Sequence, residues 1–133
     1  MLKDINFNTV TDLGMAIVEE NDNGQPIWSA YIINFGETAK EKMLITSEGY
    51  KVEKDKHLQT STLRWFMGDV APNSFAKIEE IPSELHHLNN EFMVSFYIGT
   101  QIYDRKFIFV EGSISKENLT TVPIINKKGI LIK

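Results

Sequence analysis

Apolar and polar residues alternate along several stretches of the chain, which is the pattern of β-strands that turn one face toward a core. The first two stretches run from Met15 to Glu20 and from Ile27 to Phe35. The sequence Asn-Asp-Asn-Gly at positions 21–24 separates them and favours a tight turn. The pattern therefore predicts a β-hairpin near the start of the chain.

The second of these predicted strands carries large apolar side chains on both faces. One face holds Trp28, Ala30 and Ile32, and the other holds Ile27, Tyr31, Ile33 and Phe35. Successive side chains of a strand point to opposite faces of its sheet. We therefore expect this strand to be covered on both sides, at least in part, near the centre of a sheet or in the wall of a barrel.

The clearest predicted hairpin runs from Phe92 to Ile98 and from Ile102 to Val110, and both strands are rich in β-branched and aromatic residues. Gly99 and Thr100 between them suit a two-residue type II′ turn, which prefers glycine first. This turn sets four cross-strand pairs: Ile98 with Gln101, Phe96 with Tyr103, Val94 with Arg105, and Phe92 with Phe107. One face of the hairpin is then strongly aromatic.

Five further stretches are strand-like. They are residues 43–46, 50–52, 75–81, 122–125 and 130–132. The first two are expected to form a hairpin that turns at Ser47-Glu48-Gly49, and residues 53–57 are expected to form an exposed charged loop. The short turns imply antiparallel pairing, because a parallel crossover needs a dozen or more residues.

The apolar spacing changes between Thr60 and Val70. The apolar residues that set the new spacing are Leu63, Phe66, Met67 and Val70, which fall at i, i+3, i+4 and i+7. This spacing predicts one amphipathic helix, with Thr60 or Ser61 as its N-cap and Pro72 preventing its continuation. Residues 82–88 are long enough for about two turns of a second helix.

Together these elements predict a single domain of the α+β class over residues 1–133. Its main part would be a curved antiparallel sheet of about seven strands, open or partly rolled into a barrel. One or two short helices would be inserted between residues 60 and 90.

Composition narrows the classes of function. The 133 residues are 42% hydrophobic and 24% charged, which suits one globular domain with its own core. The chain has no cysteine, which excludes disulfides, thiolate zinc sites, iron–sulfur clusters and cysteine nucleophiles. The 14 basic and 18 acidic residues give a net charge of −4, whereas proteins that coat nucleic-acid phosphate are usually strongly basic.

The sequence shows no export or membrane signal. The first residues, Met-Leu-Lys-Asp-Ile-Asn, interrupt the apolar stretch that a secretory signal needs. The longest apolar runs are a few residues long, whereas a membrane-spanning helix needs about 20. We therefore expect a cytoplasmic protein that does not contact a membrane.

No motif for catalysis or cofactor binding stands out. His86 and His87 are adjacent, and adjacent helical side chains point about 100° apart, so they cannot hold one metal ion together. The glycines are scattered without a phosphate-binding pattern, and the serine motifs of common hydrolases are absent. The sequence thus favours a protein without catalytic residues, cofactor or metal.

Six residues make up the candidate binding surface: Arg64, Trp65, Tyr103, Arg105, Lys127 and Lys128. Trp65 lies off the apolar stripe of the predicted helix, so it is either exposed beside Arg64 or covered by another element. Arg105 lies on the aromatic face of the predicted hairpin, where it can reach the rim, pair with a carboxylate, stack on a ring or present a cationic site. Lys127 and Lys128 lie at a hairpin tip, either as a solubility feature or as part of an RNA-binding surface.

Four blocks of sequence carry a resemblance to known proteins. They are residues 60–66, 88–96, 103–110 and 122–129. Together they resemble a family of small uncharacterised bacterial proteins, some of which are labelled phenylalanyl-tRNA synthetase beta subunit. The resemblance runs over most of the chain and implies a stand-alone domain of the bacterial cytosol. It implies no synthetase chemistry, because the chain is too short for that multidomain subunit and carries no class II synthetase motif.

Three functions are consistent with these features. The leading hypothesis is a small non-catalytic cytosolic module that binds a protein partner, or a second copy through an edge strand. The first alternative is an RNA- or tRNA-associated accessory protein, suggested by the basic candidates and the synthetase label. The second is a small-ligand or enzymatic pocket inside a rolled sheet, for which the expected lining is Phe92, Phe96, Tyr103 and Arg105.

Overall fold

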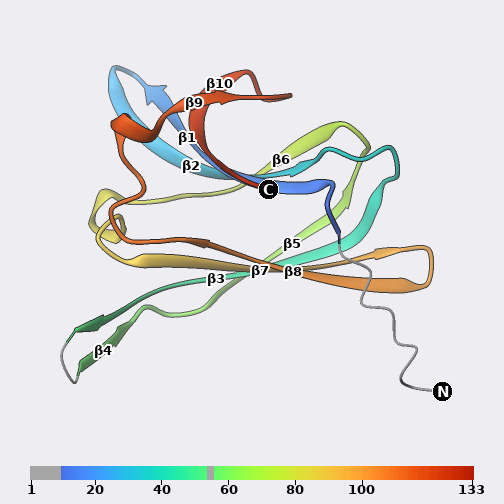
Figure 1. Ribbon diagram of the computed structural model, residues 1–133, viewed down its shortest axis with the longest axis horizontal. Coiled ribbons are helices and arrows are strands. Elements are labelled where there is room, and N and C mark those ends of the chain that lie inside the picture. The colour runs from blue at the N-terminus through green and yellow to red at the C-terminus, as the bar shows by residue number, and fades with distance from the viewer. Residues whose placement is uncertain (1–9, 54–55) are drawn as a thin grey trace.

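The computed structural model describes residues 10–53 and 56–133, which form two antiparallel sheets (Figure 1). Sheet A has the strand order β6-β2-β1-β10-β9. Its strands are β1 (Leu13–Asp22), β2 (Gln25–Asn34), β6 (Ser74–Glu80), β9 (Thr120–Val122) and β10 (Lys127–Ile132). Sheet B has the order β4-β3-β7-β8, and β5 also pairs with β3. Its strands are β3 (Lys40–Glu53), β4 (Lys56–Gln59), β5 (Leu63–Val70), β7 (Asn89–Ile98) and β8 (Gln101–Phe109).

The main core lies between the two sheets, which form the upper and lower layers of Figure 1. Alternate side chains of each strand point into this space because successive residues of a strand face opposite ways. Sheet A contributes Leu13, Met15, Ile17, Ala30 and Ile32, and sheet B contributes Met43, Ile45, Phe92, Val94, Phe96, Phe107 and Phe109. Full burial of one such large side chain stabilises the fold by about 1.5–3 kcal/mol.

A second, smaller core covers the other face of sheet A. Val122 and Ile125 pack there against a group of strand residues. That group is Ala16, Val18, Tyr31 and Ile33. The prediction that β2 is covered on both faces is therefore confirmed, and both faces of sheet A are apolar at the centre.

Two predicted hairpins are confirmed, and the second also has its predicted register. Asp22 pairs with Gln25 at the end of the β1–β2 hairpin, where Asn23 and Gly24 both have positive φ. In the β7–β8 hairpin, Gly99 has a φ of 62°. All four predicted cross-strand pairs occur there: Ile98 with Gln101, Phe96 with Tyr103, Val94 with Arg105, and Phe92 with Phe107. Local turn chemistry was sufficient to set both registers.

The amphipathic helix predicted between Thr60 and Val70 is wrong, because residues 63–70 form strand β5. This strand pairs with residues 40–47 of β3, so hydrogen bonds to a distant partner replace those of a helix. The ladder contains register shifts near Met43, and Lys42 and Gly68 have positive φ at the irregular end. The helical spacing of apolar residues was coincidental, since tertiary pairing overrides a weak local preference.

The second predicted helix is also wrong. Residues 83–85 form only a short 3-10 helix, and residues 116–118 form another. Few residues lie between the end of β6 and the start of β7, and so short a segment cannot stabilise an α-helix. The described residues are therefore nearly all-β rather than α+β, and they form two open sheets of ten strands in all, not one curved sheet or barrel of about seven.

The hairpin predicted to turn at Ser47-Glu48-Gly49 is wrong as well. Residues 40–53 form one continuous strand, and Gly49 pairs with Asn90 of β7 in the middle of the sheet. A side chain at Gly49 would meet Leu88, so this glycine serves close packing and not a turn. Residues 54–55 of the predicted charged loop lie outside the described residues.

Candidate binding surface

No described element covers the outer face of sheet B (Figure 1). Leu44 on β3 and Phe66 on β5 are directly opposite each other there, and their side chains are 40% and 74% exposed. Met93 and Tyr97 share this face, because Val94 and Phe96, which alternate with them along β7, point into the core. We call Leu44, Phe66, Met93 and Tyr97 the apolar patch.

Two cations lie beside the apolar patch. Arg64 is exposed and lies two residues before Phe66 on the same face of β5. The Lys42 ammonium lies 5.6 Å from the centre of the Tyr97 ring. Arginine and aromatic residues are enriched in protein interfaces, where they contribute a large share of the binding free energy. The combination suits a protein-binding surface.

Trp65 faces the opposite way from its neighbours on β5. Its ring packs against the main core, and its Nε1 donates a hydrogen bond to the Ser47 hydroxyl over 3.4 Å. Of the two alternatives from the sequence, the structure therefore has Trp65 covered. The exposed aromatic residue is Phe66, which sequence reasoning placed on the buried stripe of a helix. Alternation along Arg64, Trp65, Phe66 and Met67 is the signal that identifies it once a strand is assumed.

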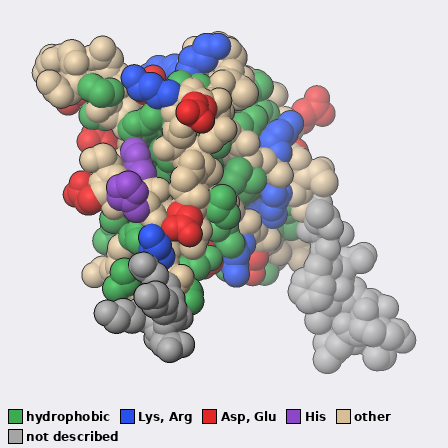
Figure 2. Space-filling model, turned by 60° about the vertical axis from the view of Figure 1, so that its left-hand side comes forward, with side chains coloured by type: hydrophobic (Ala, Val, Ile, Leu, Met, Phe, Trp, Pro, Cys, Tyr) green, Lys and Arg blue, Asp and Glu red, His purple; other side chains and the backbone are tan. Residues whose placement is uncertain are grey.

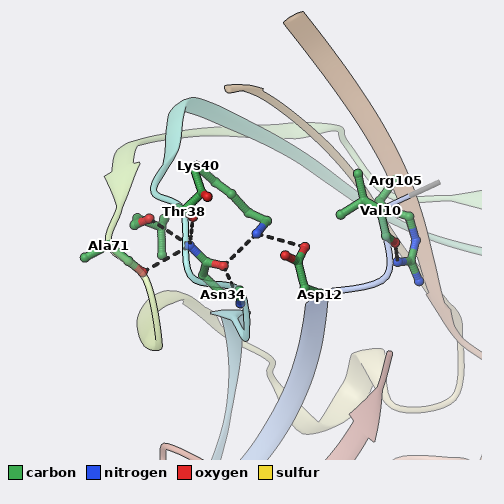
Figure 3. Close-up of polar contacts among 9 residues, drawn as sticks. Val10, Asp12, Asn34, Thr38, Lys40, Ala71 and Arg105 are labelled. Carbon is green, nitrogen blue, oxygen red and sulfur yellow. Dashed lines mark hydrogen bonds and ion pairs between the residues drawn. The ribbon is translucent and has the colours of Figure 1, made fainter. Parts of the chain in front are cut away.

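Tyr103 and Arg105 lie on the inner face of β8. The Tyr103 ring stacks on Phe96, with 5.5 Å between ring centres. The Arg105 guanidinium lies 4.6 Å from the centre of the Phe107 ring and donates from Nη1 to the Val10 carbonyl over 2.6 Å (Figure 3). Both candidates thus serve packing inside the protein. Because Phe96 is completely buried, the aromatic face of this hairpin fills the core and does not line an open pocket.

Lys127 and Lys128 line an open groove of about 620 Å³ beside the β1–β2 hairpin. The Lys127 ammonium lies 2.7 Å from the Glu20 carboxylate, and the Tyr31 hydroxyl donates to the same oxygen over 2.7 Å. Burial opposes ionisation of Glu20, but these hydrogen bonds and the charge of Lys127 outweigh it and lower the pKa of Glu20 to about 2. Burial, together with the Glu20 carboxylate, raises the pKa of the Tyr31 hydroxyl to about 12.

This groove does not favour an RNA phosphate. Its lining holds four carboxylates, Glu19, Glu20, Asp22 and Glu80, against three lysines. Lys127 is engaged by Glu20, and the Lys128 ammonium donates to the Thr121 hydroxyl. Basic and acidic side chains are interspersed on the face seen in Figure 2, whereas RNA-binding surfaces usually gather positive charge.

Glu79 lies beside a small cavity between the sheets. The β2–β6 ladder shifts register between Ala30 and Tyr31, which leaves Glu79 opposite Ala30 of the core face. Burial raises the pKa of the Glu79 carboxyl, and a hydrogen bond with the Ser47 hydroxyl partly opposes this effect. A carboxyl of raised pKa can act as a general acid. The cavity measures about 30 Å³, which suits water and leaves no room for a substrate.

A buried polar cluster joins the strands at one end of the two sheets (Figure 3). Its centre is Lys40, which is completely buried and whose ammonium lies 3.0 Å from the Asp12 carboxylate and 2.6 Å from the Asn34 side-chain oxygen. The Asn34 amide nitrogen donates to the carbonyls of Thr38, Val70 and Ala71. We call Asp12, Asn34 and Lys40 the Lys40 cluster. Because solvent does not reach the Lys40 amine, the cluster fits a structural role and not a nucleophile.

The described residues show neither a cluster of metal ligands nor a membrane-spanning helix. They contain no group of three or more His, Asp and Glu side chains placed to hold a metal ion. They also contain no helix that is long and apolar enough to span a bilayer. His86 packs against Trp28 and its Nε2 lies 3.2 Å from the Ile81 carbonyl, so its contacts are those of a packed side chain.

Comparison with known proteins found no family model that matches the chain and no curated protein that matches it significantly. The resemblance to small uncharacterised bacterial proteins therefore stays a prediction.

Proposed function

We propose that this protein is a non-catalytic interaction module that binds a protein partner through the apolar patch on the outer face of sheet B. We also propose that the protein acts in the bacterial cytoplasm, as the sequence suggests. The observation that carries the proposal is the Leu44–Phe66 pair, an aliphatic and an aromatic side chain opposed on an uncovered sheet. Burial of an exposed phenylalanine by a partner contributes about 1.5–3 kcal/mol to the free energy of binding, which favours formation of a complex.

The charges around the apolar patch define the chemistry of the partner. Arg64 and Lys42 flank the Leu44–Phe66 pair on β5 and β3. Arginine pairs well with carboxylates because its planar guanidinium can donate two parallel hydrogen bonds. The expected partner is a protein segment that places an apolar side chain on Phe66 and carboxylates beside Arg64 and Lys42.

Crosslinking from the patch tests this proposal in cells that make the protein. A photo-crosslinking aromatic amino acid replaces Phe66, and a control protein carries it at the exposed Glu117, far along the chain on a different element. We expect a discrete crosslinked product from position 66 that position 117 does not give. The same products from both positions, or none from position 66, would contradict the proposal.

Charge reversal beside the patch tests the chemistry of the partner. We expect Arg64→Glu combined with Lys42→Glu to remove most of the crosslinked product from position 66, because both changes repel carboxylates. Lys128→Glu is the matched control, since it reverses a surface lysine on sheet A and should leave the product unchanged. Ribonuclease treatment tests the alternative of an RNA-associated protein. A crosslinked product that disappears after this treatment would support that alternative over direct binding of a protein partner.

A further inference from the structure

A second interaction surface lies at the free edge of sheet B, and it is distinct from the apolar patch. β8 bonds to β7 on one side, and no described strand lies on its other side. At nine residues it is longer than the strands at the other edge of sheet B, which are β4 with four residues and β5 with eight. It is also longer than the end strands of sheet A, β6 with seven residues and β9 with three. An edge strand presents unpaired N–H and C=O groups that readily pair with another strand.

We propose that two copies of this chain form a symmetric dimer in which β8 of one copy pairs antiparallel with β8 of the other. The two copies of sheet B then become one continuous sheet. The twofold axis passes through Arg105, so residues equally far from Arg105 on its two sides lie opposite each other in the two copies. This dimer goes beyond the proposed function, because it uses a strand edge and leaves the apolar patch open.

The sequence of β8 is complementary to itself in this register. On the outer face, Asp104 lies opposite Lys106 of the second copy, and symmetry makes this ion pair twice. On the same face, Ile102 lies opposite Ile108 of the second copy, and the Ile102 side chain is 50% exposed without a partner. On the inner face, Tyr103 lies opposite Phe107 of the second copy. Opposed charges and opposed apolar side chains both stabilise antiparallel pairs.

The charges also select this register over its neighbours. The pairing of the two β8 strands can shift only in steps of two residues if the inner faces of both copies are to lie on the same side of the joined sheet. The smallest such shifts move the twofold axis to Asp104 or to Lys106. Either shift removes both Asp104–Lys106 ion pairs and sets two like charges opposite each other at the centre of the outer face. With the axis at Arg105, the like charges that lie opposite each other are the Arg105 guanidinium groups of the two copies, on the inner face. Each guanidinium is held within its own copy by the Phe107 ring and the Val10 carbonyl.

The side chains that would form the ion pairs are available. Within the described part of the chain, the Lys106 ammonium has no ion-pair partner, and Lys106 lies opposite the uncharged Met93. Asp104 accepts a hydrogen bond from the Ser95 hydroxyl at Oδ1 over 2.7 Å, which leaves its other oxygen free. Charged residues on an edge strand usually prevent pairing with foreign strands. Here the same charges favour a second copy of the strand.

Exchange of the two charges tests the dimer. Asp104→Lys sets two lysines opposite each other at both symmetric positions, and Lys106→Asp does the same with two aspartates. We expect each single variant to weaken dimerisation at least about tenfold and the double variant to restore it to within about threefold of the original. The measurement is the dimer dissociation constant by sedimentation equilibrium over a wide range of protein concentration.

Ser95→Ala is the matched control for these variants. It removes the hydrogen bond to Asp104 without changing a charge of β8, so the dissociation constant should stay within about threefold of the original. An original protein that stays monomeric at all concentrations would overturn the proposal. So would a double variant no better than the single ones. None of these variants replaces a residue of the apolar patch, although Lys106 and Ser95 adjoin Met93 and Leu44 across the strands. Crosslinking from position 66 therefore measures partner binding in each variant, separately from the dimer dissociation constant.

A disulfide tests the register directly. The chain has no cysteine, so introduced thiols react only with each other. Ile102→Cys combined with Ile108→Cys places a thiol opposite a thiol at two positions of the dimer, at a Cα separation that a disulfide can span. We expect a covalent dimer after mild oxidation of this double variant and none from either single variant. Equal crosslinking of the single variants, or none of the double variant, would exclude this register.

Discussion

The ammonium of Lys40 lies 2.6 Å from the side-chain oxygen of Asn34 at the buried end of the two sheets. The same oxygen accepts from the Gly36 amide, and the Asn34 nitrogen donates to carbonyls that include that of Val70 at the end of β5. The Asp12 carboxylate, which is half exposed, provides the opposite charge. Asn34 thus connects sheet A to sheet B through the buried ammonium of Lys40 and the buried hydrogen bond to the Val70 carbonyl.

We expect Asn34→Ala to lower the free energy of unfolding by about 3–5 kcal/mol, because it removes the side-chain donor to three carbonyls and leaves the buried Lys40 ammonium with only the half-exposed Asp12 carboxylate. Urea unfolding followed by circular dichroism gives this value. Asn21→Ala is the matched control, since it removes one exposed hydrogen bond to the Gly24 amide and should cost about 1 kcal/mol. Equal losses of stability from the two variants would show that the buried hydrogen bonds of Asn34 contribute no more than the exposed one of Asn21.

Replacement of the buried charge itself is expected to cost less. Lys40→Met keeps most of the side-chain volume and leaves Asn34 bonded to Gly36, while water can solvate the half-exposed Asp12. A buried ion pair replaced by an apolar group is often neutral, whereas removal of one partner leaves a charge unpaired. We therefore expect a loss below about 1.5 kcal/mol in the same urea measurement. A loss as large as that of Asn34→Ala would mean that the Lys40 charge is itself a major source of stability.

Substitutions of Trp65 and Phe66 distinguish strand β5 from the helix predicted for the same residues. We expect Trp65→Ala to lower the free energy of unfolding by about 3 kcal/mol, because its ring packs against the main core. Phe66→Ala should cost less than about 1 kcal/mol, because that side chain is mostly in solvent. The helix predicted from the apolar spacing gives the reverse order, so the two values decide between them.

The fold was predictable where local chemistry is decisive. A glycine at the first turn position sets the β7–β8 register by itself, and so this hairpin follows from the sequence around Gly99. The identity of β5 depends on β3, which supplies its hydrogen bonds from about twenty residues away. Because the spacing from Leu63 to Val70 fits a helix equally well, local pattern alone could not reveal this pairing.

The candidate site was predictable only in part for the same reason. Arg64 could be singled out by composition, and it does lie on the uncovered face of sheet B. Phe66 could not, because the assumed helix turned it inward. The Lys40 cluster left no signal, since a lysine inside an apolar core cannot be distinguished from a surface lysine until its carboxylate and amide partners are placed around it.

Glu20 is expected to make stability depend on pH in acid. Its pKa is lowered from an ordinary value of 4.5 to about 2, so its contribution is complete above about pH 4.5 and is lost as pH falls toward 2. Solvent screens the attraction between Glu20 and its partly exposed partners Lys77 and Lys127. The contribution of ionised Glu20 to the free energy of unfolding is therefore about 1–2 kcal/mol. Urea unfolding at pH 7, 4.5 and 3 should show this loss in the original protein and a smaller one in Glu20→Gln. Glu80→Gln, on the exposed side of the same groove, should behave like the original protein.

Glu79 is expected to have the opposite effect. Burial raises the pKa of its carboxyl in the folded protein, so folding is favoured while this group is protonated. Stability should fall as the pH rises from the ordinary pKa of 4.5 through the raised value, because the buried carboxylate must then ionise. Glu79→Gln removes this cost and keeps a group that can bond to Ser47. We expect the variant to be more stable than the original protein at pH 7 and the difference to shrink below pH 4.5. A variant that is less stable at pH 7, or a difference that does not change with pH, would show that the Glu79 carboxyl is solvated.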